Sequence, residues 1–196
     1  MSRRSFLLLI SALLFVSTLS GCGYNQIQSN EEAVFASWAD VEASYQRRAD
    51  LIPNLVETVK GYASHEKETL QAVTEARAKV GQVTLSAKDL NNPANLEKFQ
   101  AAQGQLGSAL SRLLVVAEKY PDLKASQNFS DLQNQLEGTE NRINVARQRY
   151  NASVQLFNTS IRTFPNSMTN SMLLHLERKE PFKAQAGADK APAVKF

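Results

Sequence analysis

The sequence predicts an all-α protein, an antiparallel up-and-down bundle of three to four long helices. Apolar residues recur at steps of three and four over long stretches, which is the period of amphipathic helices. No segment longer than four residues alternates as a strand does, and turn-forming residues gather at only a few places. The 196 residues suffice for one domain of ordinary size.

The first helix is expected at residues 31–79. Asn30 can cap its start, and Glu31 favours the first turn because carboxylates stabilise the positive end of a helix. The steps of three and four give its apolar stripe a heptad character, as in coiled coils. The stripe comprises Val34, Trp38, Val41, Tyr45, Ile52, Leu55, Val59, Tyr62, Val73 and Val80, with the charged residues Arg48 and Glu66 in the same phase.

Pro53 interrupts this pattern within the stretch "RRADLIPNLV". An interior proline lacks the N–H and costs a helix about 3 kcal/mol, but its neighbours are good helix formers and include no glycine. We therefore expect a kink rather than a break. If the chain breaks, it folds back as a fourth helix. If the kinked helix continues, its residues 31–52 pack on the C-terminal piece or on another subunit.

The remaining elements follow from the same periodicity. Turn formers without a helical period occupy residues 81–93, and Pro121 and Pro165 are expected to end the helices before them. Helices are expected at residues 94–120, 128–163 and 167–178. The last segment, residues 181–196, has little apolar material and two prolines and is expected to be disordered.

The N-terminus resembles a lipoprotein signal peptide over residues 1–21. Arg3 and Arg4 precede an apolar stretch that is short for a membrane span, and small residues then lead to Cys22 as in a lipobox. This pattern predicts acyl chains, such as palmitate, on Cys22, followed by a tether over residues 22–30. The alternatives are an ordinary cleaved signal, with Cys22 incidental, and an uncleaved anchor.

Composition excludes several classes of function. Without residues 1–21 the charge is 20 basic minus 19 acidic residues, or +1, which gives no electrostatic footprint for nucleic acid. One cysteine cannot form a disulfide within the chain, and one cysteine with two histidines makes a protein-built zinc site hard to assemble. We expect no metal and no cofactor.

Three blocks of the sequence resemble the LemA family. They are "YQRRADLIPNLVETVKGYASHE", the stretch "VAEKYPDLKASQNFSDLQNQLEGTENRINVARQRYN", and "FNTSIRTFP". The resemblance implies a bacterial helical bundle over residues 31–180, held at the membrane outside the cytoplasm, with no established enzymatic activity. It also implies a partner class, membrane proteins with a TPM domain. The C-terminal segment resembles the family only loosely.

Charged residues on or beside the core stripes are the candidate site residues. They are Arg48, Asp50, Glu66, Arg77, Glu140 and Arg147. We interpret them as interhelical ion pairs, or as contacts to a partner. In an up-down-up bundle the first and third helices run parallel, which predicts a pair between Glu66 and Arg147 or between Arg77 and Glu140.

The leading functional hypothesis is a non-enzymatic binding or scaffold lipoprotein of the cell envelope, which contacts a membrane-associated partner or another copy of itself through residues 31–52 and the C-terminal piece. Because Gly23 rather than Asp follows Cys22, we expect the outer membrane, facing the periplasm, if the source has two membranes. The alternatives are an envelope enzyme, for which we find no catalytic motif, and a sensor that binds a small ligand between helices.

Overall fold

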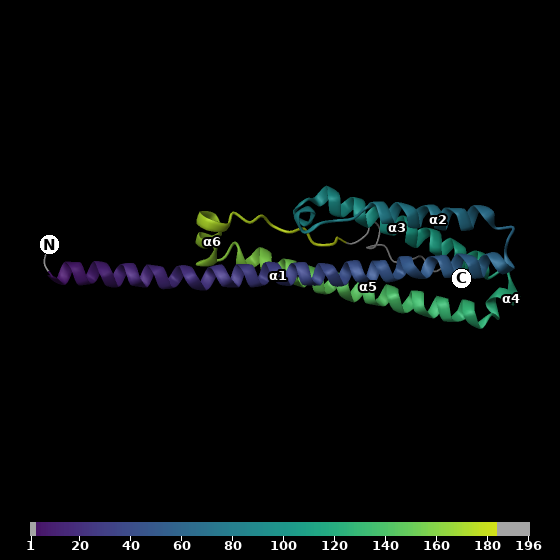
Figure 1. Cartoon of the computed structure of the whole chain (residues 1–196), viewed down its shortest axis with the longest axis horizontal. Helices are drawn as coiled ribbons and strands as arrows, with labels where there is room; N and C mark the ends of the chain where they lie inside the picture. Colours follow the sequence, from purple (N-terminus) through teal and green to yellow (C-terminus); the bar gives the residue numbers. More distant parts are fainter. Residues whose placement is uncertain (1–2, 184–196) are drawn as a thin grey trace, which may run out of the picture.

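The computed structural model describes residues 3–183, and the side chains of residues 3–22 and of Ala87 lie outside that description. Within this range the chain is all-α, with no strand. Four long helices run alternately up and down along one axis (Figure 1). They are α1 (Arg3–Tyr62), α2 (Lys67–Gln82), α3 (Pro93–Ala117) and α5 (Gln127–Ser160). The predicted all-α bundle is confirmed.

Short elements connect or end the long helices. They are η1 (Ala87–Asn91), α4 (Pro121–Lys124), α6 (Asn166–Thr169) and the π-helical turn η2 (Asn170–Leu174). The start of α3 follows from its sequence, because Pro93 occupies the first turn and the Asn92 side chain accepts a hydrogen bond from the Ala94 N–H at 3.0 Å.

The first helix continues through Pro53, as expected, without a chain break there. It differs from its prediction at two places. It already covers residues 22–30, where a tether was expected. It then ends at Tyr62, and the chain reverses over residues 63–66. The single helix expected over residues 31–79 is therefore two antiparallel helices, and the reversal buries the second part of the stripe against α3.

Two hydrophobic cores lie one after the other along the bundle. The aromatic core lies toward α6 and includes the buried rings of Trp38, Tyr45, Phe99, Tyr150, Phe157 and Phe182. The aliphatic core lies toward the reversal at residues 63–66, and among its buried side chains are Leu51, Ile52, Leu55, Val59, Leu106, Leu110, Leu113 and Leu136. Both cores are built on the heptad stripe of α1, which packs along α5.

After η2 the chain runs back along the bundle as an extended segment, which we call the C-terminal strap (residues 175–183) (Figure 1). Two asparagines of α5 fasten it through its backbone. Asn158 bonds both the N–H and the C=O of Lys179, each at 2.9 Å, and Asn151 bonds the N–H and the C=O of Phe182 at 2.8 and 3.1 Å. The prediction that disorder begins at residue 181 is therefore wrong for residues 181–183, and residues 184–196 lie outside the described part.

The strap also carries a buried charge into the bundle. Lys179 is 5% exposed and its Nζ lies 2.9 Å from Glu31 Oε1 and 5.1 Å from the centre of the Phe35 ring. Phe182 stacks on Trp38 with ring centres 5.9 Å apart. The apolar face of residues 31–52 thus packs within the chain, on α5 and the strap. This agrees with the alternative in which the face packs on the C-terminal piece.

Candidate functional site

A polar layer separates the two cores at the middle of the bundle. On α1 the aromatic core ends with Tyr45 and the aliphatic core begins with Leu51, and Arg48 lies between them with only 5% exposure. At the same level α3 contributes Gln103, which is also buried, and α5 contributes Glu140. A buried guanidinium must be paired, because an isolated charge in the protein interior costs a large free energy of desolvation.

The Arg48 side chain joins three helices. Its Nη1 donates to Glu140 Oε2 at 3.0 Å, and its Nη2 donates to the Gln103 backbone oxygen at 3.3 Å and to the Gln103 side-chain oxygen. The guanidinium also lies over the Tyr45 ring, 5.0 Å from its centre. Glu140 keeps 52% of its side chain exposed, so the pair is buried on the arginine side only. This geometry fixes the register of α1, α3 and α5.

A groove of about 480 Å³ opens beside this layer. Tyr45, Arg48, Gln103, Glu140 and Arg147 contribute its polar lining. Burial raises the pKa of the Tyr45 hydroxyl, and the positive charges of Arg147 and Arg48 oppose that shift. Arg48 Nε has no hydrogen-bond acceptor among the described residues. The groove therefore offers two guanidinium groups and an unused buried donor beside two carboxylates, those of Glu137 and Glu140.

Arg147 contacts the strap rather than Glu66. Its Nη2 donates to the Lys183 backbone oxygen at 3.3 Å, and its guanidinium lies over the Phe182 ring at 4.8 Å. The predicted pair of Glu66 with Arg147 is wrong because the extra reversal at residues 63–66 makes α5 antiparallel to α1. Glu66 instead accepts a hydrogen bond from the Tyr120 hydroxyl at 3.1 Å, which raises the pKa of Tyr120.

Arg77 compensates for the proline in α1. Pro53 has no N–H to donate to the carbonyl oxygen of Ala49, four residues earlier. Arg77 Nε, on α2, donates to that same oxygen at 3.0 Å. The predicted pair of Arg77 with Glu140 is therefore wrong, and sequence reasoning missed this contact because it had placed Arg77 on the same helix as Pro53. Asp50 stays on the surface, where it accepts from Gln46 Nε2 at 2.7 Å.

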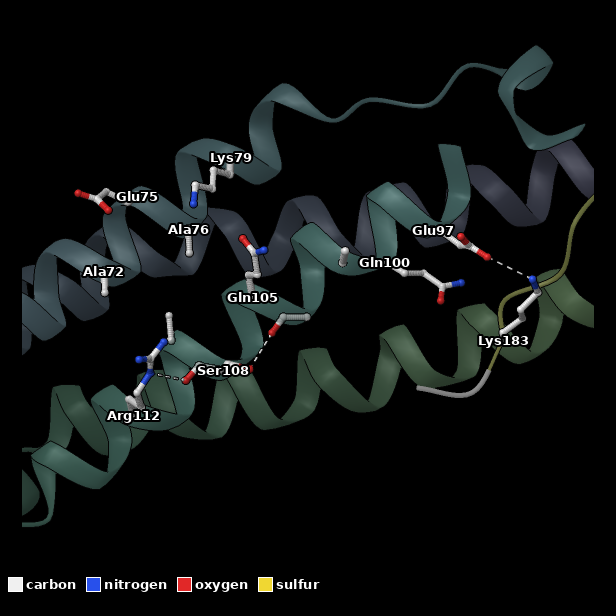
Figure 2. Close-up of a pocket in the computed structure, with 13 residues that line it drawn as sticks. Ala72, Glu75, Ala76, Lys79, Glu97, Gln100, Gln105, Ser108, Arg112 and Lys183 are labelled. Carbon is white, nitrogen blue, oxygen red and sulfur yellow. Dashed lines mark hydrogen bonds and ion pairs between the residues drawn. The ribbon is translucent and has the colours of Figure 1, made fainter. Parts of the chain in front are cut away.

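A second and larger groove, of about 930 Å³, runs between α2 and α3 (Figure 2). Small side chains line it, and longer charged side chains stand around it. The small residues are Ala72, Ala76, Ala101, Gly104, Ser108 and Ala109, and the charged residues are Glu75, Lys79, Glu97, Arg112 and Lys183. Lys183 of the strap lies 3.3 Å from Glu97 at one end (Figure 2). Sequence reasoning did not find this groove, because spacing within each helix does not show which surface residues of two helices come together.

Two further properties of the described part bear on the candidate site. Among the described side chains of residues 23–183, no three His, Cys, Asp or Glu come together as a metal site would require. Among the residues whose side chains the structure describes, no helix has both the length and the apolar character needed to cross a membrane. Cys22 lies within α1, but its side chain is outside the described part.

The chain is similar in sequence to a known family and to several known proteins. The model of the LemA family matches residues 37–196. Protein LemA of Metamycoplasma hominis is 26% identical over 119 residues, 61% of this chain and 50% of that protein. Magnetosome protein MamQ of Magnetospirillum gryphiswaldense and magnetosome protein MamQ 2 of Paramagnetospirillum magneticum are each 25% identical over 150 residues, 68% of this chain and 55% of theirs.

This chain spans about half the length of the curated relatives it matches. The matched region of the family model nevertheless includes residues 37–62 of α1 and all of α2, α3, α5 and the strap. The polar layer of Arg48, Gln103 and Glu140 and the proline contact of Arg77 therefore all lie inside it. Because the family model matches far more than half of the chain, the chain belongs to the LemA family.

Proposed function

We propose that the protein is a non-enzymatic binding scaffold of the cell envelope, held at a membrane by acyl chains on Cys22 outside the cytoplasm. The observation that carries the proposal is the continuity of α1, which leads from the lipobox-like segment into the bundle without a linker. A helix has a fixed rise of about 1.5 Å per residue, so it holds its surfaces at set distances from its start.

The way the polar groups are used also supports a scaffold. The charged residues on the core stripes bind one another or the backbone: Arg48 with Glu140, Arg77 with the Ala49 carbonyl, and Glu66 with Tyr120. Such contacts set the register of helices, and they leave these groups engaged within the fold. A scaffold needs that rigidity, because a preformed surface loses less entropy when it binds.

The binding surface is the groove between α2 and α3, and the partner is a membrane-associated protein. The small residues of the groove let another helix approach closely, and the charges beside it, of both signs, can fix its register. The apolar face of residues 31–52 no longer needs a partner, because α5 and the strap cover it. We therefore propose the α2–α3 groove as the contact region, in place of the face of residues 31–52 that the sequence had predicted.

A photo-crosslinking experiment on the full-length lipidated protein tests this proposal. A photoreactive residue at Gln105, which lines the groove, should trap a membrane-associated protein in its native membrane. The matched control is Gln148, an exposed glutamine on α5 that lines none of the described grooves. Equal cross-linking from both positions, or none from Gln105, would overturn the groove as the binding surface.

Cys22→Ala tests the anchor separately. The lipid chains should be lost, as measured by mass spectrometry of the N-terminal peptide, and the protein should leave the membrane fraction unless the signal remains uncut. The control is the wild-type protein, in which the same measurement should find acyl chains on Cys22. A wild-type chain without acyl groups on Cys22 would contradict the lipid anchor.

The Arg48 groove supports a second candidate, a sensor for a small anionic ligand. Arg48 Nε is a buried donor without an acceptor among the described residues, and Arg147 lines the same groove. Titration of the purified protein with acetate and with inorganic phosphate, followed by thermal unfolding, tests this function. A rise in midpoint that Arg147→Gln removes would support the sensor, and no rise at millimolar concentrations would count against it for these anions.

A further inference from the structure

Exposed apolar side chains gather at the end of the bundle that holds α6 and η2. Phe164 is 78% exposed, Met172 70%, Leu173 64% and Met168 53%, and Tyr24 of α1 lies at the same end with 43% exposed. Single exposed apolar residues are ordinary on a protein surface. Several together on a few consecutive turns are not, because such patches mark surfaces that meet another apolar phase.

The segment that carries the patch has no negative charge. Between Glu140 and Glu177 the sequence contains no Asp or Glu, while it contains Arg142, Arg147, Arg149 and Arg162. In the segment from residue 159 to residue 176, Arg162 is the one residue with a permanent charge, and the remaining polar groups are mostly Ser, Thr and Asn. A segment of this composition adds no repulsion from anionic lipid headgroups and can attract them through its arginine.

The patch lies directly beside the start of the mature chain that we propose. Gly23 packs so closely on α6 that a Cβ there would lie 2.9 Å from Asn166 Oδ1 and 3.1 Å from Thr169 Oγ1. Cys22 is the preceding residue of the same helix, and α1 continues past this end of the bundle (Figure 1). Acyl chains on Cys22 would therefore bring α6 and η2 to the membrane surface.

We propose that residues 164–173 form a second membrane contact, in which Phe164, Met168, Met172 and Leu173 enter the interface between headgroups and acyl chains. The inference rests on the proposed lipid anchor and deepens it. Acyl chains alone would leave the protein free to tilt, whereas a second contact fixes the direction of the bundle. Arg162, at the edge of the patch, is positioned to meet lipid phosphates.

A fluorescent probe distinguishes insertion of residues 164–173 into the bilayer from attachment through the acyl chains alone. The full-length lipidated protein carries Met172→Cys, labelled with an environment-sensitive dye, and is reconstituted into vesicles of phosphatidylethanolamine and phosphatidylglycerol. Native Cys22 does not compete for the dye when its thiol is acylated. The matched control is Val115→Cys on α3, an apolar residue of similar exposure, 66%, at the opposite end of the bundle.

Upon reconstitution the dye at position 172 should gain intensity several-fold, shift to shorter wavelength, and be quenched by brominated lipids. The dye at position 115 should remain in water. Position 172 behaving like position 115, while mass spectrometry finds Cys22 acylated, would overturn the membrane contact and leave the anchor intact. Missing acyl chains on Cys22 would overturn the anchor, whatever the dye at position 172 reports.

The double variant Phe164→Ser/Met168→Ser should lower the quenching of the dye at position 172, and unchanged quenching would also contradict insertion.

Discussion

The two halves of the bundle are stabilised in different ways. The aliphatic core lies where four helices surround one another, and Leu, Ile and Val of regular size fill it. The aromatic core lies where α1 and α5 continue beyond α2, and it depends on rings and on the strap to close it. Large rings each bury about 150–250 Å² and can span a gap that aliphatic side chains would leave open. A region with fewer helices can therefore keep a dry core if the rest of the chain returns to cover it.

The largest expected effect comes from breaking the aromatic half at the strap. Phe182→Ala removes a buried ring that contacts Trp38 and Tyr150, and it should cost about 3 kcal/mol of unfolding free energy. Hydrogen exchange should quicken in the strap and in residues 31–45, while amides beside the aliphatic core keep their protection. Glu177→Ala, at an exposed strap position, is the control and should change little. Uniform loss of protection throughout would show that the two halves do not differ in this way.

The polar layer between the halves should respond less strongly. Glu140→Gln leaves the buried guanidinium of Arg48 without its carboxylate and should cost about 1–2 kcal/mol, a range reduced because half of Glu140 is exposed. Arg48→Met removes the buried charge itself and should cost less than Glu140→Gln. Urea unfolding of both variants and of the double variant measures their coupling. Glu137→Gln, one turn away and exposed, is the control, and equal effects of Glu137→Gln and Glu140→Gln would contradict the pairing.

A smaller effect is expected where α2 meets α1 in the aliphatic half. Arg77→Met should cost about 1 kcal/mol because the Ala49 carbonyl loses its donor. In a Pro53→Ala background the N–H of residue 53 can bond that carbonyl, so Arg77→Met should cost clearly less there. Chemical denaturation of the four proteins in this cycle gives the coupling energy. Strict additivity would mean that Arg77 does not compensate for the proline.

The smallest effect is a pH dependence that arises at Tyr150, in the aromatic half. Burial, with a lesser contribution from Glu180, raises the pKa of Tyr150, so the folded state favours the neutral phenol. Its stabilising contribution is complete below the unfolded tyrosine pKa of 10.0 and is lost as pH rises from there toward the folded pKa. Urea midpoints near neutral pH and just above pH 10 should therefore fall less steeply in Tyr150→Phe than in the wild type. An identical decline in both would contradict this origin.

The sequence predicted the regular parts of the fold well because heptad spacing is a local signal. The stripes of α1 and α5 and the charged residues on them were recognised from spacing alone. The reversal after Tyr62 was missed because the stripe of α2 continues in the phase of α1, and Pro53 is a stronger breaker signal than Gly61. That one missed turn reversed the direction assigned to α5, and so both predicted ion pairs were wrong, while Arg48 and Glu140, which do form a pair, were not matched with each other.

The strap shows a different limit of sequence reasoning. Its composition is that of a disordered segment, with little apolar material around Pro181. What orders it is a set of contacts from distant residues, above all the side chains of Asn151 and Asn158, which hold its backbone rather than its side chains. A backbone held in this way leaves little trace in the strap's own sequence, so neither the strap nor the groove that its Lys183 borders could be read from local patterns.

The uninterrupted first helix has a consequence for where the protein can act. From Gly23 to Tyr62 it covers about 60 Å at about 1.5 Å per residue, without a joint that could fold up. A chain attached to a bilayer at Cys22, with its direction fixed by a second contact at residues 164–173, would keep its reversal and α4 at that height and would hold the α2–α3 groove part-way along it. Inserting or deleting a whole helical turn before the bundle would then change the distance between the membrane and the α2–α3 groove. Binding of partners at one fixed height would be lost while the fold stayed unchanged.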